Sequence, residues 1–161
     1  MKRLISLLLS VILMFSFFVF DTYALEEDFD PYVISFSLTS DNTVLSDNAN
    51  DTRATGLITS YSLSISKTGT TLKIYATTYG SISVVKSGFK DIMVQRRKTS
   101  SDSWYDYYDY GNVYVDEINA NLSTSVAVVS GYQYRVTCTH YAKKNLLMIQ
   151  TVDNVSNIIT I

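Results

Sequence analysis

Apolar and polar residues alternate with a period of two along most of the chain beyond residue 56. In the clearest stretch, residues 60–66, every second residue is a serine, and Tyr, Leu and Ile stand between the serines. This is the pattern of a strand with one face in a core and the other in water. A turn with Gly69 follows, and the alternation resumes over residues 72–77. These two stretches predict a β-hairpin.

The pattern continues to the C-terminus without a sustained helical period. Residues 131–141, which are rich in aromatic and β-branched side chains, are predicted to form the central strand. Further short strands are predicted within residues 82–85, 92–97, 104–115, 121–129 and 147–161. The sequence therefore predicts an all-β protein, an antiparallel β-sandwich of seven to nine strands, with a β-barrel as the alternative.

The N-terminus has the features of a secretion signal. Lys2 and Arg3 precede an apolar run over residues 4–20, and a Thr-Tyr-Ala site ends at Ala24. We therefore expect residues 1–24 to be a signal helix that is cleaved after Ala24, and the protein to be secreted. Because the apolar run nearly spans a bilayer, an uncleaved membrane anchor is the alternative.

The rest of the chain divides into a polar lead and one domain. Residues 25–56 are mostly acidic residues, Ser, Asn and Thr, so we expect a flexible, solvated lead. An apolar stretch at residues 32–38 is either a short strand or part of this linker, and the linker is the favoured interpretation. Residues 57–161 then form a single sandwich domain, which is long enough to bury a core.

Charge and cysteine content limit the partners and the source. Without residues 1–24 the chain keeps 11 basic and 14 acidic side chains, a net charge of −3. This weak acidity argues against nucleic acid and anionic membranes as partners, because both bind basic surfaces. Cys138 is the only cysteine, so no disulfide can form within the chain. Secretion without disulfides predicts a Gram-positive source, which has no oxidising periplasm.

Tyr132, Tyr134, Val136 and Cys138 alternate along the predicted central strand. This spacing resembles the penultimate strand of immunoglobulin-like and fibronectin-type-III domains. The resemblance implies an immunoglobulin-like sandwich, in which a tyrosine near the strand start bonds back to the preceding corner. Trp104 does not stand at the core-tryptophan position of antibody domains, and the disulfide is absent, so an antibody-type domain is excluded.

Residues 56–161 also resemble small secreted proteins of Gram-positive anaerobes that carry a domain of unknown function. The resemblance rests on a serine-rich first strand, on Gln95 and Arg96 in a middle strand, and on Trp104 soon after. Its most specific part is the strand that contains Gly131, Tyr134, Arg135, Val136 and His140. The resemblance implies a fold and an extracellular location. It does not imply an activity.

The most unusual composition lies in the predicted strand at residues 104–110, which interleaves aromatic and acidic residues. Aromatic rings stack on sugars and supply contact area in protein recognition. In a regular strand, alternate side chains point to the same face. One face would then carry Trp104, Tyr108 and Tyr110 with Asp106. The other face would carry Tyr105 and Tyr107 with Asp109. One group should be exposed whichever face packs. We predict a binding surface made of Trp104, Tyr105, Tyr107, Tyr108 and Tyr110. The alternative is that these aromatics are core residues of a strand.

Candidate catalytic and metal-binding residues are few. Cys138 and His140 point to one face of their strand with Cα atoms about 6.6 Å apart, whereas a working Cys–His pair needs direct contact. We therefore expect Cys138 to be a buried apolar residue. One histidine and one cysteine do not complete a zinc site. The calcium-loop spacing is absent from the acids Asp102, Asp106, Asp109, Asp116 and Glu117. No catalytic residue, metal or cofactor is predicted.

These observations predict a secreted, non-catalytic module that binds an extracellular protein or glycan. Two alternatives stay open. One is a structural protein that self-associates through an edge strand, and the other is a hydrolase whose carboxylates meet only in the fold. Neither nucleic acid nor, after cleavage of the signal, a membrane is expected as a partner.

Overall fold

The computed structural model describes residue 31, residues 33–41 and residues 56–161. The predicted signal at residues 1–24 and most of the predicted lead lie outside these ranges. Within them no helix is long and apolar enough to cross a bilayer. The regular elements there are β1 (Val33–Asp41), β2 (Ile58–Thr68), β3 (Thr71–Gly80), β4 (Lys86–Arg97), β5 (Tyr105–Val115), β6 (Asn119–Ala127), β7 (Gln133–Lys143), β8 (Ile149–Val155) and β9 (Ile159–Thr160). The all-β prediction is confirmed.

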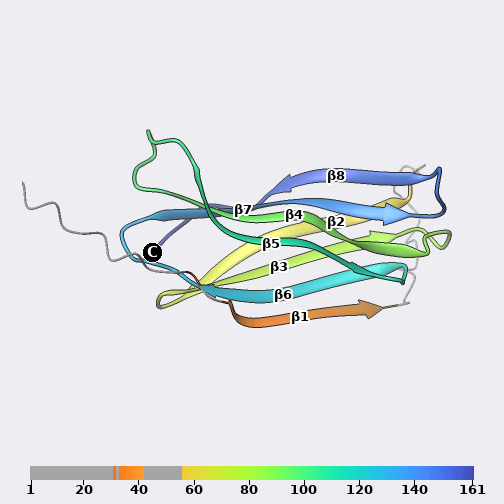
Figure 1. Ribbon diagram of the computed structural model, residues 1–161, viewed down its shortest axis with the longest axis horizontal. Coiled ribbons are helices and arrows are strands. Elements are labelled where there is room, and N and C mark those ends of the chain that lie inside the picture. The colour runs from red at the N-terminus through yellow and green to blue at the C-terminus, as the bar shows by residue number, and fades with distance from the viewer. Residues whose placement is uncertain (1–30, 32, 42–55) are drawn as a thin grey trace, which may run out of the picture.

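The strands form two antiparallel sheets that pack face to face. One sheet has the order β1-β6-β3-β2, and the other has the order β5-β4-β7-β8, with β9 pairing with the start of β7. Figure 1 shows the strands running along the length of the molecule, with the connections gathered at its two ends. In the lettering of immunoglobulin domains, β2, β3 and β6 correspond to A, B and E, and β4, β7 and β8 to C, F and G. The predicted antiparallel β-sandwich is therefore confirmed.

The structure differs from the favoured linker interpretation over residues 33–41. These residues form β1, which pairs with β6 along its whole length. Leu38 packs against the core, and the hydroxyls of Ser35 and Ser125 share a hydrogen bond of 2.7 Å. β1 thereby occupies the edge beside β6 that strand D fills in an immunoglobulin domain. The alternation within this short stretch was a strand pattern.

The β2–β3 hairpin is confirmed. Thr68 pairs with Thr71, so the loop consists of Gly69 and Thr70. Gly69 has a φ of 59°, which a residue with a side chain rarely adopts and which two-residue hairpin loops need. The alternate serines of β2 are exposed, while Ile65 reaches the core, as the pattern predicted.

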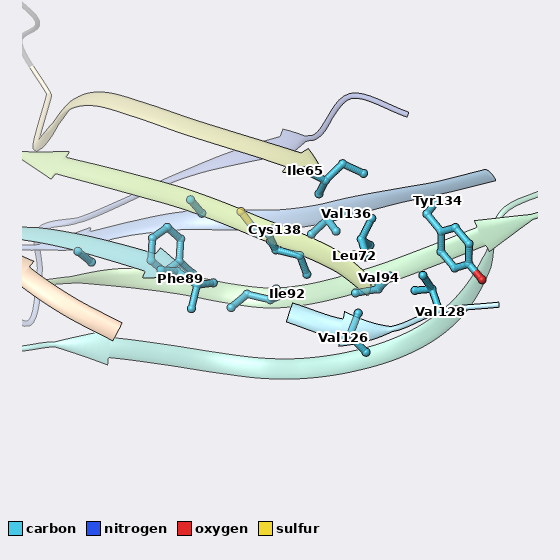
Figure 2. Close-up of a cluster of buried hydrophobic side chains, with 14 residues drawn as sticks. Ile65, Leu72, Phe89, Ile92, Val94, Val126, Val128, Tyr134, Val136 and Cys138 are labelled. Atoms are coloured by element: carbon cyan, nitrogen blue, oxygen red, sulfur yellow. The ribbon is translucent and has the colours of Figure 1, made fainter. Parts of the chain in front are cut away.

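The core lies between the two sheets and takes alternate residues from both. On β7 the inward side chains of Tyr134, Val136 and Cys138 are buried, and the residues between them are only half-buried. Figure 2 shows these side chains meeting Leu72 and Val126 from the other sheet in one cluster. Full burial of each such side chain stabilises a fold by about 1.5–3 kcal/mol, so this cluster is the main source of stability.

Tyr134 forms the corner contact that the resemblance implied. Its side chain is buried at one end of the cluster (Figure 2). Its hydroxyl accepts a hydrogen bond from the Val129 N–H at 3.0 Å and donates one to the Val129 carbonyl at 2.9 Å. One side chain thus satisfies both backbone groups of a residue in the β6–β7 connection, which fixes where β7 begins.

The outer edge of β2 is partly covered by side-chain amides. Asn157 accepts a hydrogen bond from the Ile65 N–H at 3.1 Å and donates one to the Ile65 carbonyl at 3.2 Å. Gln150 accepts hydrogen bonds from the N–H groups of Leu57 and Ile58. Because edge strands associate through unpaired backbone groups, this cover counts against self-association through β2.

Candidate binding surface

A β-bulge in β5 sets the direction of the predicted aromatic residues. The consecutive β4 residues Val94 and Gln95 pair with Tyr108 and Asp106, so Tyr107 is an extra residue in the ladder. A second register shift lies farther along β5. A bulge interrupts the strict alternation of side chains between the two faces of a strand. The period-two grouping of this strand therefore does not hold.

The bulges turn three of the predicted surface residues inward. Tyr107, Tyr108 and Tyr110 are half-buried and pack against the core cluster. The Tyr107 hydroxyl donates to the Ala127 carbonyl of the opposite sheet at 3.1 Å, and the Tyr110 hydroxyl accepts from the Thr124 hydroxyl at 3.2 Å. The predicted grouping by faces is wrong, because these three tyrosines lie on one side of β5, and for them the core interpretation applies.

Trp104 and Tyr105 remain at the surface. The centroid of the Trp104 ring lies 4.3 Å from the Arg97 guanidinium carbon and 4.4 Å from that of Arg135. Both distances are within the range of cation–π attraction. Tyr105 exposes 65% of its surface. A partner can therefore reach these two residues, although guanidinium groups already occupy part of the Trp104 ring surface.

The guanidinium groups are held by amides. Arg97 donates through Nε to the Gln133 side-chain oxygen at 2.8 Å, and Arg135 donates through Nε to the Gln95 side-chain oxygen at 2.9 Å. The four residues occupy alternate positions on β4 and β7 and so share the outer face of their sheet. Within the described ranges the single ion pair lies elsewhere. The positive charges of both arginines are therefore not neutralised by a paired carboxylate.

A hollow of about 430 Å³ opens beside these arginines. The Arg96 guanidinium lies against the Tyr107 and Tyr132 rings at its edge, 4.9 and 4.6 Å from the ring centroids. The hollow is lined by Arg96, Arg97, Lys98, Asp102, Tyr105, Asp106 and Tyr132. We call the surface formed by Arg96, Arg97, Lys98, Trp104, Tyr105, Tyr132 and Arg135 the arginine–aromatic surface.

The electrostatics of this surface follow from burial. Desolvation raises the pKa of Tyr107 to about 12, with Tyr134 adding to the rise and Arg96 opposing it. Desolvation lowers the pKa of Arg135, and the neighbouring charge of Arg97 lowers it further. Guanidinium groups nevertheless stay charged in proteins. At neutral pH the Tyr107 phenol beside this surface is therefore neutral, and the guanidinium groups are positively charged.

Cys138 and His140 meet in the interior. The thiol sulfur lies 3.8 Å from His140 Nε2, and both side chains are buried. The Asn154 amide donates to Nε2 at 3.2 Å, so Nδ1 carries the proton and donates to the Thr78 hydroxyl at 2.8 Å. The Thr78 hydroxyl in turn donates to the Gly88 carbonyl at 3.2 Å. This network joins the two sheets.

The Cys138–His140 contact does not activate the thiol. Burial raises the pKa of Cys138 to about 12, with a further rise from Asp153, and burial lowers the pKa of His140 to about 4. At neutral pH both groups are therefore uncharged. Since the thiolate is the nucleophilic form of cysteine, this pair lacks the charge state that catalysis requires.

The acidic residues considered as calcium ligands make separate local interactions. Asp102 accepts hydrogen bonds from the N–H and hydroxyl of Thr99, and Asp109 accepts one from a backbone N–H two residues farther on. Asp116 pairs with Lys86 at 3.1 Å. In the part of the chain that the structure describes, no three His, Cys, Asp or Glu side chains gather around a common point that could hold a metal ion.

Sequence reasoning missed the cations of this surface. It singled out the aromatic strand and did not include Arg97, Lys98 or Arg135. A signal was present, because a glutamine and an arginine alternate in the same order on β4 and on β7. Two such strands side by side bring all four side chains to one face.

The fold and this surface define an antiparallel β-sandwich with a basic, aromatic surface at one end. Comparisons with protein-family models, with curated proteins and with solved structures found no match to the chain. The resemblance to secreted proteins of Gram-positive anaerobes stays a prediction, as does the Gram-positive source.

Proposed function

We propose that the protein is a secreted, non-catalytic module that binds an extracellular protein or glycan through the arginine–aromatic surface. The observation that carries the proposal is the hollow in which Arg96, Arg97 and Lys98 face Tyr105 and Tyr132. Tyrosine and arginine are the residues that most often dominate recognition surfaces, since they combine contact area with directed hydrogen bonds. The secreted address rests on the basic start, apolar run and Thr-Tyr-Ala site of residues 1–24.

The charge of the surface indicates that the partner presents acidic groups. The amide partners of Arg97 and Arg135 orient the guanidinium groups without neutralising them. Asp102 and Asp106 also line the hollow, but each accepts a hydrogen bond from a neighbouring side chain. Carboxylates and sulfates accept paired hydrogen bonds from guanidinium groups, which neutral sugars do not match.

The absence of catalysis is part of the proposal. It is supported by the uncharged state of the buried Cys138–His140 pair and by the separate roles of Asp102, Asp109 and Asp116. A carboxylate-based hydrolase needs two acids a few ångströms apart across a substrate cleft. These three acids instead hold turns and one ion pair.

A binding experiment tests the proposal. The wild-type protein is applied to a glycan array that includes uronate and sulfated glycans, and it is used in a pull-down from culture medium. The variant Lys98→Gln/Tyr105→Ser removes one exposed cation and one exposed aromatic ring from the surface. We expect at least a tenfold loss of affinity for the recovered partner, because one aromatic anchor alone often contributes more than about 1.4 kcal/mol.

The matched control is Lys73→Gln/Tyr75→Ser, which removes the same residue types from the outer face of the other sheet, where Tyr75 is 43% exposed. This variant should bind like the wild type. Silence of the wild type in both assays would contradict the proposal, and so would an equal loss in both variants.

A further inference from the structure

The end of the sandwich opposite the arginine–aromatic surface exposes a group of aliphatic side chains. The β3–β4 and β7–β8 connections lie together there, at the right-hand end of Figure 1, and the Val85 N–H donates to the Lys143 carbonyl. Leu147 is 95% exposed, Leu146 is 84% exposed and Ile82 is 79% exposed. We call the group Ile82, Val85, Leu146, Leu147, Met148 and Ile149 the apolar tip. Strands were predicted at residues 82–85 and from residue 147, but residues 82–85 lie in a connection and β8 begins only at Ile149.

The β7–β8 connection is held in a shape that keeps its leucines in water. The Asn145 side-chain oxygen accepts hydrogen bonds from the N–H groups of Leu147 and Met148, at 3.0 and 2.9 Å. The Lys144 N–H donates to the Met148 carbonyl at 3.0 Å. A loop whose own hydrogen bonds present adjacent aliphatic residues to solvent is unfavourable in isolation, since it leaves apolar surface hydrated. Contiguous exposed apolar surface of this kind marks an interaction site.

Basic residues stand at the base of the tip. Lys143 is the last residue of β7, Lys144 is the first residue of the connection and stands two positions before Leu146, and Lys86 follows Val85. Lys86 is paired with Asp116 of the β5–β6 connection, and within the described ranges this is the one ion pair. Lys143 and Lys144 therefore form no ion pair with a described residue. Lysines thus flank the apolar group, and the acidic residues Asp116 and Glu117 lie in the β5–β6 connection at the same end (Figure 1).

A hollow of about 500 Å³ adjoins the tip. Its wall includes the apolar side chain of Met148 together with Lys144, Ser81 and Ser83. The hydroxyls of Ser81 and Ser83 lie 3.0 Å apart. An ammonium group and two hydroxyls beside an aliphatic edge match the boundary between a phosphate headgroup and an acyl chain.

We propose that the apolar tip docks on an anionic phospholipid membrane. Leu146 and Leu147 enter the acyl region, while Lys143 and Lys144 contact lipid phosphates. Leu146 and Leu147 are exposed in the connection, and Lys143 and Lys144 precede them in the chain, with Asn145 between. A protein surface would need a groove shaped to receive this turn, whereas a bilayer accepts it through buried apolar area and attraction of lysine to anionic lipid. This proposal does not depend on the proposed function of the opposite end.

Site-specific fluorescence tests the proposal. The full chain carries an environment-sensitive dye at Leu147→Cys or, as a control, at Ser101→Cys in the exposed β4–β5 connection at the other end. Cys138 is buried and stays unlabelled in the folded protein. With vesicles of phosphatidylcholine and phosphatidylglycerol, the dye at position 147 should shift to the blue and be quenched by brominated acyl chains, and the dye at position 101 should do neither.

Two further variants separate the contributions. In the Leu147→Cys background, Lys143→Gln/Lys144→Gln should weaken insertion about tenfold or more at low salt, because each lysine near an anionic surface contributes about fivefold. Lys67→Gln, which removes a lysine from the far β2–β3 end, should leave insertion unchanged. Since the dye reports its own position, binding of vesicles by another part of the chain does not imitate the result.

Three outcomes would overturn the proposal. The first is the absence of a spectral shift at position 147 with anionic vesicles. The second is equal insertion into pure phosphatidylcholine, which would remove the role of anionic lipid. The third is a shift that appears without vesicles and grows with protein concentration, which would assign the tip to contacts between copies of the chain.

Discussion

The two ends of the sandwich differ in how their large surface side chains are contacted by the rest of the protein. At the arginine–aromatic surface, Trp104 is contacted by two guanidinium groups, and each of these is held by an amide. At the apolar tip, hydrogen bonds of Asn145 hold Leu146 and Leu147 away from the fold. The large side chain at the first end is contacted by other groups of the protein, whereas the leucines at the second end are left exposed to water.

The strand β7 connects both ends and carries a different buried anchor in each half. Near the arginine–aromatic surface, Tyr134 bonds to the backbone of Val129. Nearer the tip, His140 bonds to side chains of Thr78 and Asn154. Only the second anchor can take up a proton in the ordinary pH range. Stability should therefore respond to acid through the tip half and to hydroxyl removal through the other half.

The largest expected effect is acid destabilisation through His140. The pKa of this residue is about 4 in the folded protein and near 6.5 when unfolded. Between these values the unfolded chain binds a proton that the folded protein does not bind. Stability is therefore constant above about pH 6.5, falls as the pH drops, and loses about 3 kcal/mol in total near pH 4.

Urea denaturation of the wild type and of His140→Gln at several pH values measures this effect. The difference between the two curves should fall between about pH 6.5 and 4. His140 is the only histidine, so its ring resonances give the folded-state pKa directly. A titration midpoint near 6.5, or parallel curves for the two proteins, would rule this anchor out as the acid-sensitive group.

The next effect concerns the anchor at the other end. Tyr134→Phe removes the hydroxyl that serves both backbone groups of Val129, and we expect a loss of about 1–3 kcal/mol. Unlike the His140 effect, this loss should be the same at pH 5 and pH 7, because the tyrosine stays neutral throughout. Thermal unfolding at the two pH values checks both parts. A pH-dependent loss would break the contrast between the two halves of β7.

A smaller effect is expected from the tryptophan. Trp104→Ala removes two cation–π contacts at a half-exposed site, and each such contact is worth about 0.5–1 kcal/mol. We expect a stability loss of about 1 kcal/mol together with weaker binding of the proposed acidic partner, because Arg97 and Arg135 lose the ring that they pack against. Denaturation and binding are measured on the same preparation. Unchanged binding would show that the guanidinium groups do not need the indole ring.

The smallest effect on stability is expected at the tip. Leu146→Ser/Leu147→Ser changes two residues that are 84% and 95% exposed, so the free energy of unfolding should change by less than about 0.5 kcal/mol. Denaturation of this double variant beside the wild type measures it. A loss of several kcal/mol would mean that the leucines are covered in the folded molecule, and the contrast between the ends would disappear.

The fold could be predicted from the sequence to a large extent. Alternation identified β2, β3 and β7, because a strand between water and core must sort its side chains by parity. The resemblance to immunoglobulin-like domains implied a corner contact by a tyrosine near the start of β7, and it did not distinguish Tyr132 from Tyr134. Residues 33–41 were assigned to a linker. The pairing of this short apolar stretch with β6 cannot be predicted from the stretch itself, because it depends on a strand far along the chain.

The candidate site could be predicted only in part. The extra residue Tyr107 changes which side chains of β5 point inward beyond it. This bulge depends on the register with β4, so it could not be predicted from the sequence of β5 alone. The contact of Cys138 with His140 was missed because a separation of Cα atoms does not limit how side chains bend toward each other. The exposure of Leu147 was missed because residues in a hairpin connection and residues in a strand can have the same composition.

Trp104 is the only tryptophan of the chain, and it stands between two guanidinium groups at one end of the sandwich. Its intrinsic emission therefore comes from a single place. An acidic compound that draws Arg97 or Arg135 away changes the surroundings of the indole ring and thus its emission spectrum. Trp104 fluorescence therefore provides a label-free assay for the binding of anions at this surface, whatever the natural partner is.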